Sequence, residues 1–364
     1  MLKIITILLL VIMPLTLNAK PMGELDPKKQ NILVIHSWHD ILWDRLWCRG
    51  LNNILANDYN LIRYDLDAMR KDEKEVKKRA KYSLELAKQY NAVGIVFGDD
   101  MALKHAGPLF EGSSYPSVYL GINFSPRKYL DYSKASNFTG VLERPLYKTS
   151  FKKILKIFNN KSVNVLLLSD SPLGKEDVTD LAKLFKNSSK IKIFNSTLEF
   201  QVQDSWEKWQ KAVLDAPANG YDAIFVGSRY ILRDKNSKYI EPETEVLSWM
   251  NKNSKLPFFG FFEDGIGPKL YIGGWVLSGI EHGESAGNIM KDILLHGKNP
   301  ADINPIYHDK GQYIFSKKML EKYKIKLPKE IEEQTEFIED RHDLWNFDKY
   351  IQDELPCEAT KVYR

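Results

Sequence analysis

Small polar and acidic residues follow almost every apolar segment of this sequence. They occupy residues 36–39 (His-Ser-Trp-His), 98–100 (Gly-Asp-Asp), 123–125 (Asn-Phe-Ser), 169–171 (Ser-Asp-Ser), 227–229 (Gly-Ser-Arg) and 263–265 (Glu-Asp-Gly). Carboxylates, amides and hydroxyls supply hydrogen bonds, and the neighbouring aromatic rings supply stacking surfaces. This combination is typical of a site for a small polar molecule. The same residue types also cap helices and form turns, so capping is the competing interpretation of each residue taken alone.

The predicted ligand contacts are drawn from these groups: Trp38, His39, Asp99, Asn123, Asp170, Ser228 and Asp264. Trp38 would stack on the ligand, and the carboxylates and the Asn123 amide would exchange hydrogen bonds with hydroxyl or ammonium groups. Acids outnumber bases at these positions, so the expected ligand is neutral and polar or cationic, and a phosphate is disfavoured. Arg144 and Arg229 are the bases that could also point inward.

A metal site is a second chemistry that the histidines suggest. His36 and His39, with Asp40 beside them, could share an ion with Asp99 or Asp264. Zinc sites generally use three or four dedicated ligands. No second pair of closely spaced histidines follows in the sequence, so we predict no metal site.

Catalytic signatures are missing from the sequence. Residues 174–175 (Gly-Lys) continue with Glu where a phosphate-binding loop needs Ser or Thr, and Ser228 lacks the second glycine of a nucleophile elbow. Residues 265–268 (Gly-Ile-Gly-Pro) do not form a dinucleotide fingerprint. The acidic pair 99–100 could do acid–base work, but no nucleophile accompanies it. We therefore predict no enzyme, no catalytic residues and no cofactor.

The elements that must position these residues alternate between strands and helices. A first set has expected strands at 31–36, 60–66, 92–97, 117–122 and 138–142 and helices at 41–56 and 72–90. A second set has strands at 163–168, 190–194, 223–226 and 258–262 and helices at 172–186, 204–216 and 242–252. Such alternation predicts parallel sheets built from right-handed βαβ units, with ligands beyond the carboxyl ends of the strands. The break near residues 142–147 predicts two similar Rossmann-like lobes of an α/β protein.

The end of the sequence adds elements to this plan. A strand at 271–277, a helix at 283–295, another strand and a short helix at 317–323 are expected. Gly297 and Pro300 are the stop signals of the long helix. Charged residues dominate from Pro328 onward, and this tail could wrap a lobe or bind a partner.

Length and composition agree with a folded protein of two domains. The chain has 364 residues, of which 43% are hydrophobic and 27% charged. Its 52 basic and 48 acidic residues leave a net charge of +4. This near-balance gives no reason to expect a nucleic-acid partner, which requires a concentrated basic surface.

The first residues are typical of a cleaved export signal. A basic start at Lys3 is followed by an apolar run from Ile4 to Leu17, and Ala19 is a small residue at the expected cleavage position. About 14 apolar residues is short for a bilayer, which needs about 20. No cysteine at the cleavage site offers a lipid anchor, and no later segment resembles a membrane span. We expect a soluble periplasmic protein that is not embedded in the membrane.

The sequence holds only two cysteines, Cys48 and Cys357. An oxidising compartment would permit a bridge between them. Cys48 lies in a helical pattern that looks buried and Cys357 lies in a polar tail, so two unpaired thiols are the simpler expectation.

Several motifs resemble those of a known family. Residues 32–39 (Ile-Leu-Val-Ile-His-Ser-Trp-His) with Trp43 are similar to the first strand and loop of ABC-transporter substrate-binding proteins of the type I periplasmic binding fold, which also include extracellular sensor modules. Trp38 stands where that family typically has Tyr. Residues 140–143 (Gly-Val-Leu-Glu) resemble its crossover between lobes, and residues 260–283 resemble its late strand–strand–helix block. The matches run in order over about residues 31–325.

The resemblance implies two lobes joined by three crossings. Lobe 1 would hold residues 27–142 and 275–300, lobe 2 residues 143–274 and 301–328, with a signal peptide at 1–19 and a C-terminal extension at 329–364. It also implies that the lobes close like a hinge on a ligand.

Three functions follow from this interpretation. The first is a solute-binding protein that delivers a small polar ligand to the permease of an ABC importer. The second is a periplasmic sensing subunit that signals to a membrane histidine kinase or cyclase, which the long C-terminal tail mildly favours. The third, an exported enzyme on a similar scaffold, is the least favoured.

Overall fold

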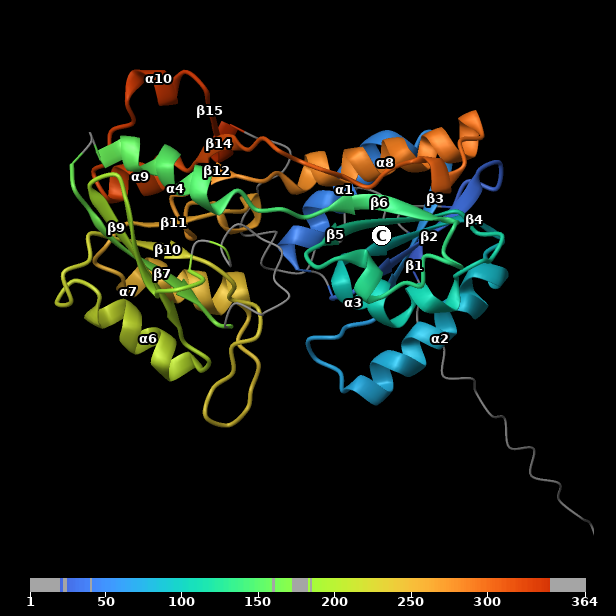
Figure 1. The fold of residues 1–364 in the computed structure, drawn as a ribbon, viewed down its shortest axis with the longest axis horizontal. Coiled ribbons are helices and arrows are strands. Elements are labelled where there is room, and N and C mark those ends of the chain that lie inside the picture. Colours follow the sequence, from blue (N-terminus) through green and yellow to red (C-terminus); the bar gives the residue numbers. More distant parts are fainter. Residues whose placement is uncertain are drawn as a thin grey trace, which may run out of the picture.

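The computed structural model describes residues 20–21, 25–39, 41–158, 161–171, 183 and 185–340, and these residues form two lobes that lie side by side (Figure 1). Three predicted segments lie wholly or largely outside the described residues: the export signal at 1–19, the helix at 172–186 and the tail beyond residue 340. No helix among the described residues is both long enough and apolar enough to span a bilayer.

The first lobe is built on a seven-stranded sheet of order β1-β3-β2-β4-β5-β6-β13. Its strands are β1 (Lys20–Pro21), β2 (Gln30–His36), β3 (Tyr59–Asp65), β4 (Ala92–Gly98), β5 (Ser117–Ile122), β6 (Phe138–Leu142) and β13 (Ile306–Tyr307). Only the edge strand β1 is antiparallel to its neighbour. The central strands are continuous apolar runs because helices cover both faces of the sheet.

Alternate residues of each strand face opposite helical layers. Ile32 and Val34 of β2 pack with α1 (Leu42–Leu55) and α8 (Gly279–His296), whereas Leu33 and Ile35 pack with α2 (Glu73–Gln89) and α3 (Asp99–His105). Figure 1 shows α1 and α8 above this sheet and α2 and α3 below it. The two layers leave the ends of the strands, and not their faces, as the place for a polar site.

The second lobe has a five-stranded sheet of order β11-β10-β7-β9-β8. Its strands are β7 (Asn164–Ser169), β8 (Lys190–Ile193), β9 (Ser196–Val202), β10 (Ala223–Val226) and β11 (Phe258–Gly260). β7, β9, β10 and β11 are parallel, and β8 forms an antiparallel hairpin with β9. The strand predicted at 190–194 is therefore an edge strand, and the parallel neighbour of β7 is β9, which the sequence analysis missed.

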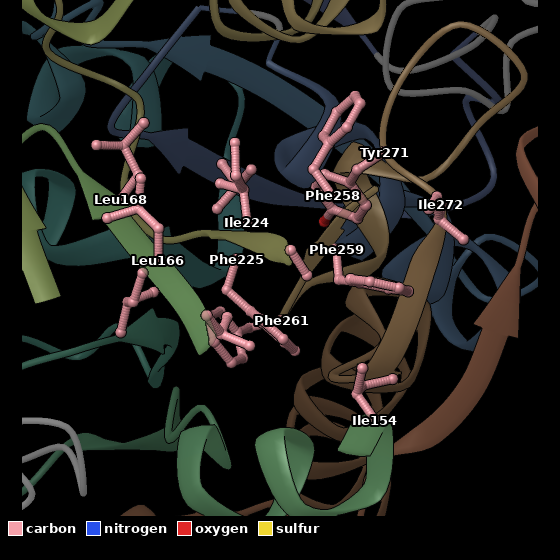
Figure 2. Close-up of a cluster of buried hydrophobic side chains, with 14 of the residues drawn as sticks. Ile154, Leu166, Leu168, Ile224, Phe225, Phe258, Phe259, Phe261, Tyr271 and Ile272 are labelled. Atoms are coloured by element: carbon pink, nitrogen blue, oxygen red, sulfur yellow. The ribbon is translucent and has the colours of Figure 1, made fainter. Parts of the chain in front are cut away.

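Helices and a third sheet complete the second lobe. The helices are α4 (Tyr147–Leu155), α6 (Trp206–Asp215), a π-helical turn at Pro242–Leu247 that leads into α7 (Ser248–Asn253), α9 (Lys317–Lys322) and α10 (Lys329–Glu332). The third sheet joins β12 (Gly273–Val276), β14 (Gln312–Phe315) and β15 (Thr335–Phe337). Figure 2 shows part of the shared core, in which the ring of Phe225 on β10 packs against those of Phe259 and Phe261. Short 3₁₀ turns lie at 107–109, 126–128, 156–158, 263–265, 300–302 and 338–340.

The chain crosses between the lobes three times, as predicted. The first crossing joins β6 to α4, and the second lies between Val276, in the second-lobe core, and Leu277, in the first-lobe core. The third joins β13, which pairs with β6, to β14, which pairs with β12. The detailed lobe boundaries stay a prediction; strand pairing places β13 in the sheet of the first lobe and β15 in the third sheet.

Helices α1 and α8 pack closely against each other, and glycines permit this contact. A Cβ added to Gly50 would overlap the backbone of Ile280, and one added to Gly283 would overlap the carbonyl of Trp47. Helix α8 begins at the cap Ser278, whose hydroxyl accepts a hydrogen bond from the amide of Glu281, and ends at Gly297 with φ +65°.

Cys48 corrects one expectation of the sequence analysis. Its side chain is fully buried in α1 and it is disulfide-bonded, not a free thiol. Its Sγ also lies 3.4 Å from Nε2 of His36. Cys357 lies outside the described residues. Helical burial alone was a poor guide to the state of this thiol, because a buried sulfur can pack equally well when bridged.

Candidate functional site

The candidate site is built from side chains that follow the carboxyl ends of the strands in both lobes. β2, β4 and β6 lead to Trp38, Asp99 and Glu143. β7 and β10 lead to Asp170 and Ser228, and β11 leads through a short turn to Asp264. Because the strands are parallel neighbours within each sheet, their ends lie at one edge.

Trp38 and Asp99 form a direct pair. The indole Nε1 of Trp38 donates to Oδ2 of Asp99 at 2.9 Å, and the other carboxylate oxygen of Asp99 accepts from the amide of Asp100 at 2.6 Å. Asp99 begins α3 with φ +71°, in the left-handed region that few residues other than glycine adopt. Burial, and then the neighbouring charge of Asp100, raise the pKa of Asp99 well above its usual range. The carboxyl group is thus held in place while its charge is disfavoured.

Asp100 and Asn123 join the loops after β4 and β5. The carboxylate of Asp100 accepts from the backbone amide of Asn123 at 2.9 Å and from that of Phe124 at 3.3 Å. The side-chain amide of Asn123 donates to the carbonyl of Gly121 at 3.3 Å. Burial raises the pKa of Asp100 despite these hydrogen bonds. The hydrogen bonds of Asp100 and Asn123 thus agree with the competing interpretation of these residues, in which they cap helices and form loops.

Glu143 lies at the start of the first crossing, beside Gly121 near the end of β5. It is 5% exposed, and burial followed by the charges of Asp99, Asp100 and Asp264 raises its pKa well above its usual range. Gly121 has φ +70°, and a Cβ added there would lie 3.7 Å from Oε2 of Glu143. The strand-end backbone therefore passes close beside this carboxyl group.

Arg144 supports the same loops from the next position in the chain. Its Nη1 donates to the carbonyl oxygens of Ile122 at 2.8 Å, Asn123 at 3.0 Å and Glu143 at 2.6 Å. These bonds tie the loops after β5 and β6 together. One guanidinium group thus adds positive charge to a region rich in carboxyl groups.

The second lobe contributes a buried charge network around Arg229. Nη2 of Arg229 donates to Asp264 Oδ2 at 2.8 Å and to Glu243 Oε1 at 3.0 Å, and the hydroxyl of Tyr230 also donates to Asp264 Oδ2. Asp264 is fully buried, and its Oδ1 has no hydrogen-bond partner among the described residues. Burial raises the pKa of Glu243 to about 7. The network leaves one buried carboxylate oxygen unsatisfied, which is costly unless something binds it.

Asp170 and Ser228 form the other part of this lobe's edge. The amide of Asp170 donates to the carbonyl of Ser228 at 2.9 Å, and Asp170 Oδ2 accepts from the amide of Ile231 at 2.7 Å. Burial raises the pKa of Asp170. The pair links the loops after β7 and β10 and so fixes where Tyr230 lies.

The two lobes touch near this edge. Tyr230 of the second lobe packs against the same first-lobe cluster as Trp38 and Met69. Around it, Arg70 Nη2 lies 3.0 Å from Glu241 Oε1, and the hydroxyl of Tyr239 lies 3.1 Å from Sδ of Met69. The structure therefore holds an arrangement in which the lobes contact each other beside the strand ends.

The predicted contacts have different surroundings in the structure. Trp38 and Asp99 form a pair in the first lobe, and Asp264 belongs to the network around Arg229 in the second. Asn123, Asp170 and Ser228 organise the neighbouring loops. His39 is mostly exposed and its Nδ1 lies 2.7 Å from Asp65 at the end of β3. Whether each of the seven contacts a ligand stays a prediction.

Sequence reasoning overlooked several residues of this edge. Glu143 immediately follows β6, so the strand-end rule would have selected it, but it was interpreted only as part of a crossing. Tyr230 was overlooked as well, although its neighbour Arg229 was considered as a residue that could point inward. Glu243 lies on a π-helical turn far along the chain, and no sequence signal marks it.

The contacts of His36 in the first lobe indicate a structural role. His36 is fully buried, with Nδ1 2.9 Å from Asp44 and its ring stacked at 4.4 Å on Trp47. Within the part of the chain that the structure describes, no group of three or more His, Cys, Asp or Glu side chains is arranged to hold a metal ion.

Comparison with known proteins identifies the architecture. No protein-family model matches the sequence, and no curated protein matches it. Among solved structures, an ABC domain in complex with L-Trp from Streptococcus pneumoniae is similar, with 16% identity and a TM-score of 0.57. A conserved domain protein from Vibrio cholerae has 17% identity and a TM-score of 0.59. A ligand-free, open substrate-binding protein with adhesive properties from Clostridium difficile has 12% identity and a TM-score of 0.55.

Each of these alignments covers 85% of this chain and 99% of the other. The chain has the type I periplasmic binding fold. At such low identity the likeness concerns the fold, and the ligand and partners must be argued from the chain's own residues.

Proposed function

We propose that the protein is a periplasmic solute-binding protein that captures a small polar ligand between its two lobes and delivers it to an ABC importer. The observation that carries this proposal is the meeting of buried polar side chains from both lobes at the strand ends. Trp38 and Asp99 come from one lobe, and Tyr230 and Asp264 come from the other. The three crossings supply the hinge about which such lobes open and close.

The arrangement supports binding better than catalysis. Most polar groups at this edge are already hydrogen-bonded to loops, as a preformed recognition surface requires. Solved structures with a similar fold include a complex with L-Trp and a substrate-binding protein, which supports the same class of function. We propose Trp38, Asp99, Asn123, Asp170, Ser228 and Asp264 as contacts, with His39 at the exposed margin.

A thermal-shift screen tests the proposal. The protein from residue 20 onward is screened against amino acids, sugars, polyamines and nucleosides. A ligand that binds only the folded state raises Tm with the logarithm of its concentration. We expect at least one hit that Trp38→Ala or Asp99→Ala abolishes and that Glu85→Gln, on the exposed face of α2, leaves unchanged. Silence of a well-folded sample across the whole panel would contradict solute capture.

The partner is a separate part of the proposal. A sensing subunit that signals to a membrane histidine kinase or cyclase would capture its ligand in the same way and differ only in what reads the closed form. Genes for a permease and an ATPase beside this gene would support the importer. Genes for a kinase or cyclase, together with co-purification of that membrane protein, would support the sensor instead.

A further inference from the structure

We propose that the ligand is an organic cation, such as a di- or polyamine, whose protonated amine lies among the carboxyl groups of Asp99, Glu143 and Asp264. This inference rests on the proposed function and names the chemical class of its ligand. The sequence alone is compatible with a neutral polar ligand as well as with a cationic one. The arrangement of the side chains favours the cationic ligand.

The balance of charge at the strand ends favours a cationic ligand. Two guanidinium groups, those of Arg144 and Arg229, lie among a larger set of buried carboxyl groups: Asp99, Asp100, Glu143, Asp170, Glu243 and Asp264. Arg229 is already engaged by Asp264 and Glu243. The carboxyl groups of the first lobe are therefore left in excess, and a buried carboxylate is costly unless a cation compensates it.

A cationic ligand is also favoured by a buried carboxylate oxygen that has no hydrogen-bond partner among the described residues. Asp264 is fully buried, and its Oδ2 accepts from both Arg229 and Tyr230, while its Oδ1 has no partner among the described residues. In the first lobe, a Cβ added to Gly121 would lie 3.7 Å from Oε2 of Glu143 and 3.6 Å from the backbone of Asp99, so these two acidic residues meet at the end of β5. An ammonium group has three donors and no acceptor, and it can satisfy oxygens that no protein donor reaches.

The aromatic rings beside these carboxyl groups also favour a cationic ligand. Trp38 is held by its indole nitrogen to Asp99, and Tyr230 is held by its hydroxyl to Asp264. Both rings pack against the same first-lobe cluster, Trp38 from within that lobe and Tyr230 from the other. A cation is attracted to the face of an aromatic ring as well as to a carboxylate. Rings anchored by acids thus offer both attractions to one amine.

An anionic ligand is disfavoured by the same geometry. Asp99, Asp100 and Glu143 would repel it, and the guanidinium groups that could attract it already donate to carbonyl oxygens or to carboxylates. A neutral polyol would form hydrogen bonds but would not offset the cost of charging these buried carboxyl groups, whereas an ammonium group would.

Isothermal titration with a matched series of four-carbon probes tests the inference. The probes are putrescine, 1,4-butanediol and succinate, which share a chain length and differ in charge; spermidine extends the series. The full mature protein is used at low ionic strength. We expect binding of putrescine or spermidine, with Kd at least tenfold lower than for the diol or the dianion.

Charge-neutralising variants assign the binding to this site. Asp99→Asn and Glu143→Gln keep the size of each side chain and remove its charge, and each should weaken amine binding at least tenfold. Glu85→Gln is the matched control, since it removes a carboxylate from the same lobe at an exposed position. The Tm of each ligand-free variant is measured alongside. We expect Glu143→Gln to be at least as stable as the parent protein, because it relieves repulsion among buried acids.

The outcomes separate the inference from the function on which it rests. Amine binding that the two variants weaken supports both. A neutral or anionic compound from the wider screen that binds in place of amines overturns the cationic class and leaves solute capture standing. Amine binding that Asp99→Asn and Glu143→Gln do not change also overturns the inference. No binding by any compound overturns both.

Discussion

His282 is a fully buried side chain near all three crossings between the lobes. Neither ring nitrogen has a hydrogen-bond partner among the described residues, and its ring centroid lies 5.0 Å from that of His308 and 5.7 Å from that of Trp43. Burial, and then the charges of His308 and Arg144, lower its pKa to about 3. The folded protein therefore holds this imidazole neutral.

This residue predicts a pH dependence of stability. The histidine takes up a proton near pH 6.5 when unfolded but only near pH 3 when folded, so its contribution to the unfolding free energy is complete above pH 6.5 and declines as the pH falls toward 3. Relative to His282→Leu, the parent protein should lose ~2 kcal/mol between pH 7 and pH 5. Urea unfolding of both proteins at the two pH values measures the difference, and parallel pH profiles would contradict the prediction.

Residue chemistry was only partly predictable from the sequence. The strand-end rule selected Asp99 and Asp264, because strand ends can be located from apolar runs. The bond between Trp38 and Asp99 joins residues 61 positions apart and exists because β2 and β4 are neighbours, which the order of elements along the chain does not specify. Glu243 reaches Arg229 from an irregular π-helical turn, and such a contact depends on tertiary packing alone.

At the scale of elements, the second lobe shows where pattern reasoning fails. Residues 190–194 and 196–202 are both strand-like, and the turn between them places them in an antiparallel hairpin. Only the first segment was predicted as a strand. β9 pairs with β7, and most of its residues are half-buried, unlike the continuous buried run of β7. Helices with strong apolar periodicity, such as α1, α2 and α6, were located to within a few residues.

The contact between α1 and α8 predicts a large effect of a small substitution. Gly283→Ala adds a methyl group where it would overlap the carbonyl of Trp47 in the facing helix. Alanine favours a helix over glycine by about 1 kcal/mol, but overpacking against backbone costs ~1–3 kcal/mol or more, so the net effect is destabilising. We expect Tm to fall by several degrees, as measured by circular dichroism.

Gly94→Ala is the matched comparison for that substitution. The methyl group added there would meet Sδ of Met290 at 2.8 Å, and this flexible side chain can move aside. Its Tm should fall less than that of Gly283→Ala. Equal losses would show that rigid helix contact is not the cause.

At the scale of the whole molecule, the contribution of the lobe–lobe contact to closure can be measured separately from that of the ligand's own contacts. Arg70 and Glu241 lie at the margin of the site, and both side chains are more than a third exposed, so their pair contributes only ~0.5 kcal/mol to closure. Arg70→Ala should weaken the affinity for an identified ligand about twofold, mainly through faster dissociation.

A double-mutant cycle with Glu241→Ala checks this prediction. Dissociation rates of the parent, both single variants and the double variant are measured at low and high salt. The coupling between the two residues should shrink as salt screens the pair. A coupling that high salt leaves unchanged would exclude an ion pair as the origin of the effect.

The late position of α8 in the sequence has a consequence for how the protein matures. The first lobe contains α1 and most of its sheet within the first 142 residues, yet the helix that covers α1 begins only at Gly279. Until that segment is available, the side of α1 that carries Gly50 has no counterpart to pack against. The second lobe, whose central sheet spans residues 164–260, can order itself in the meantime. We therefore expect the N-terminal half to be the last to become resistant to proteases, and truncation before residue 279 to leave a chain that proteases degrade.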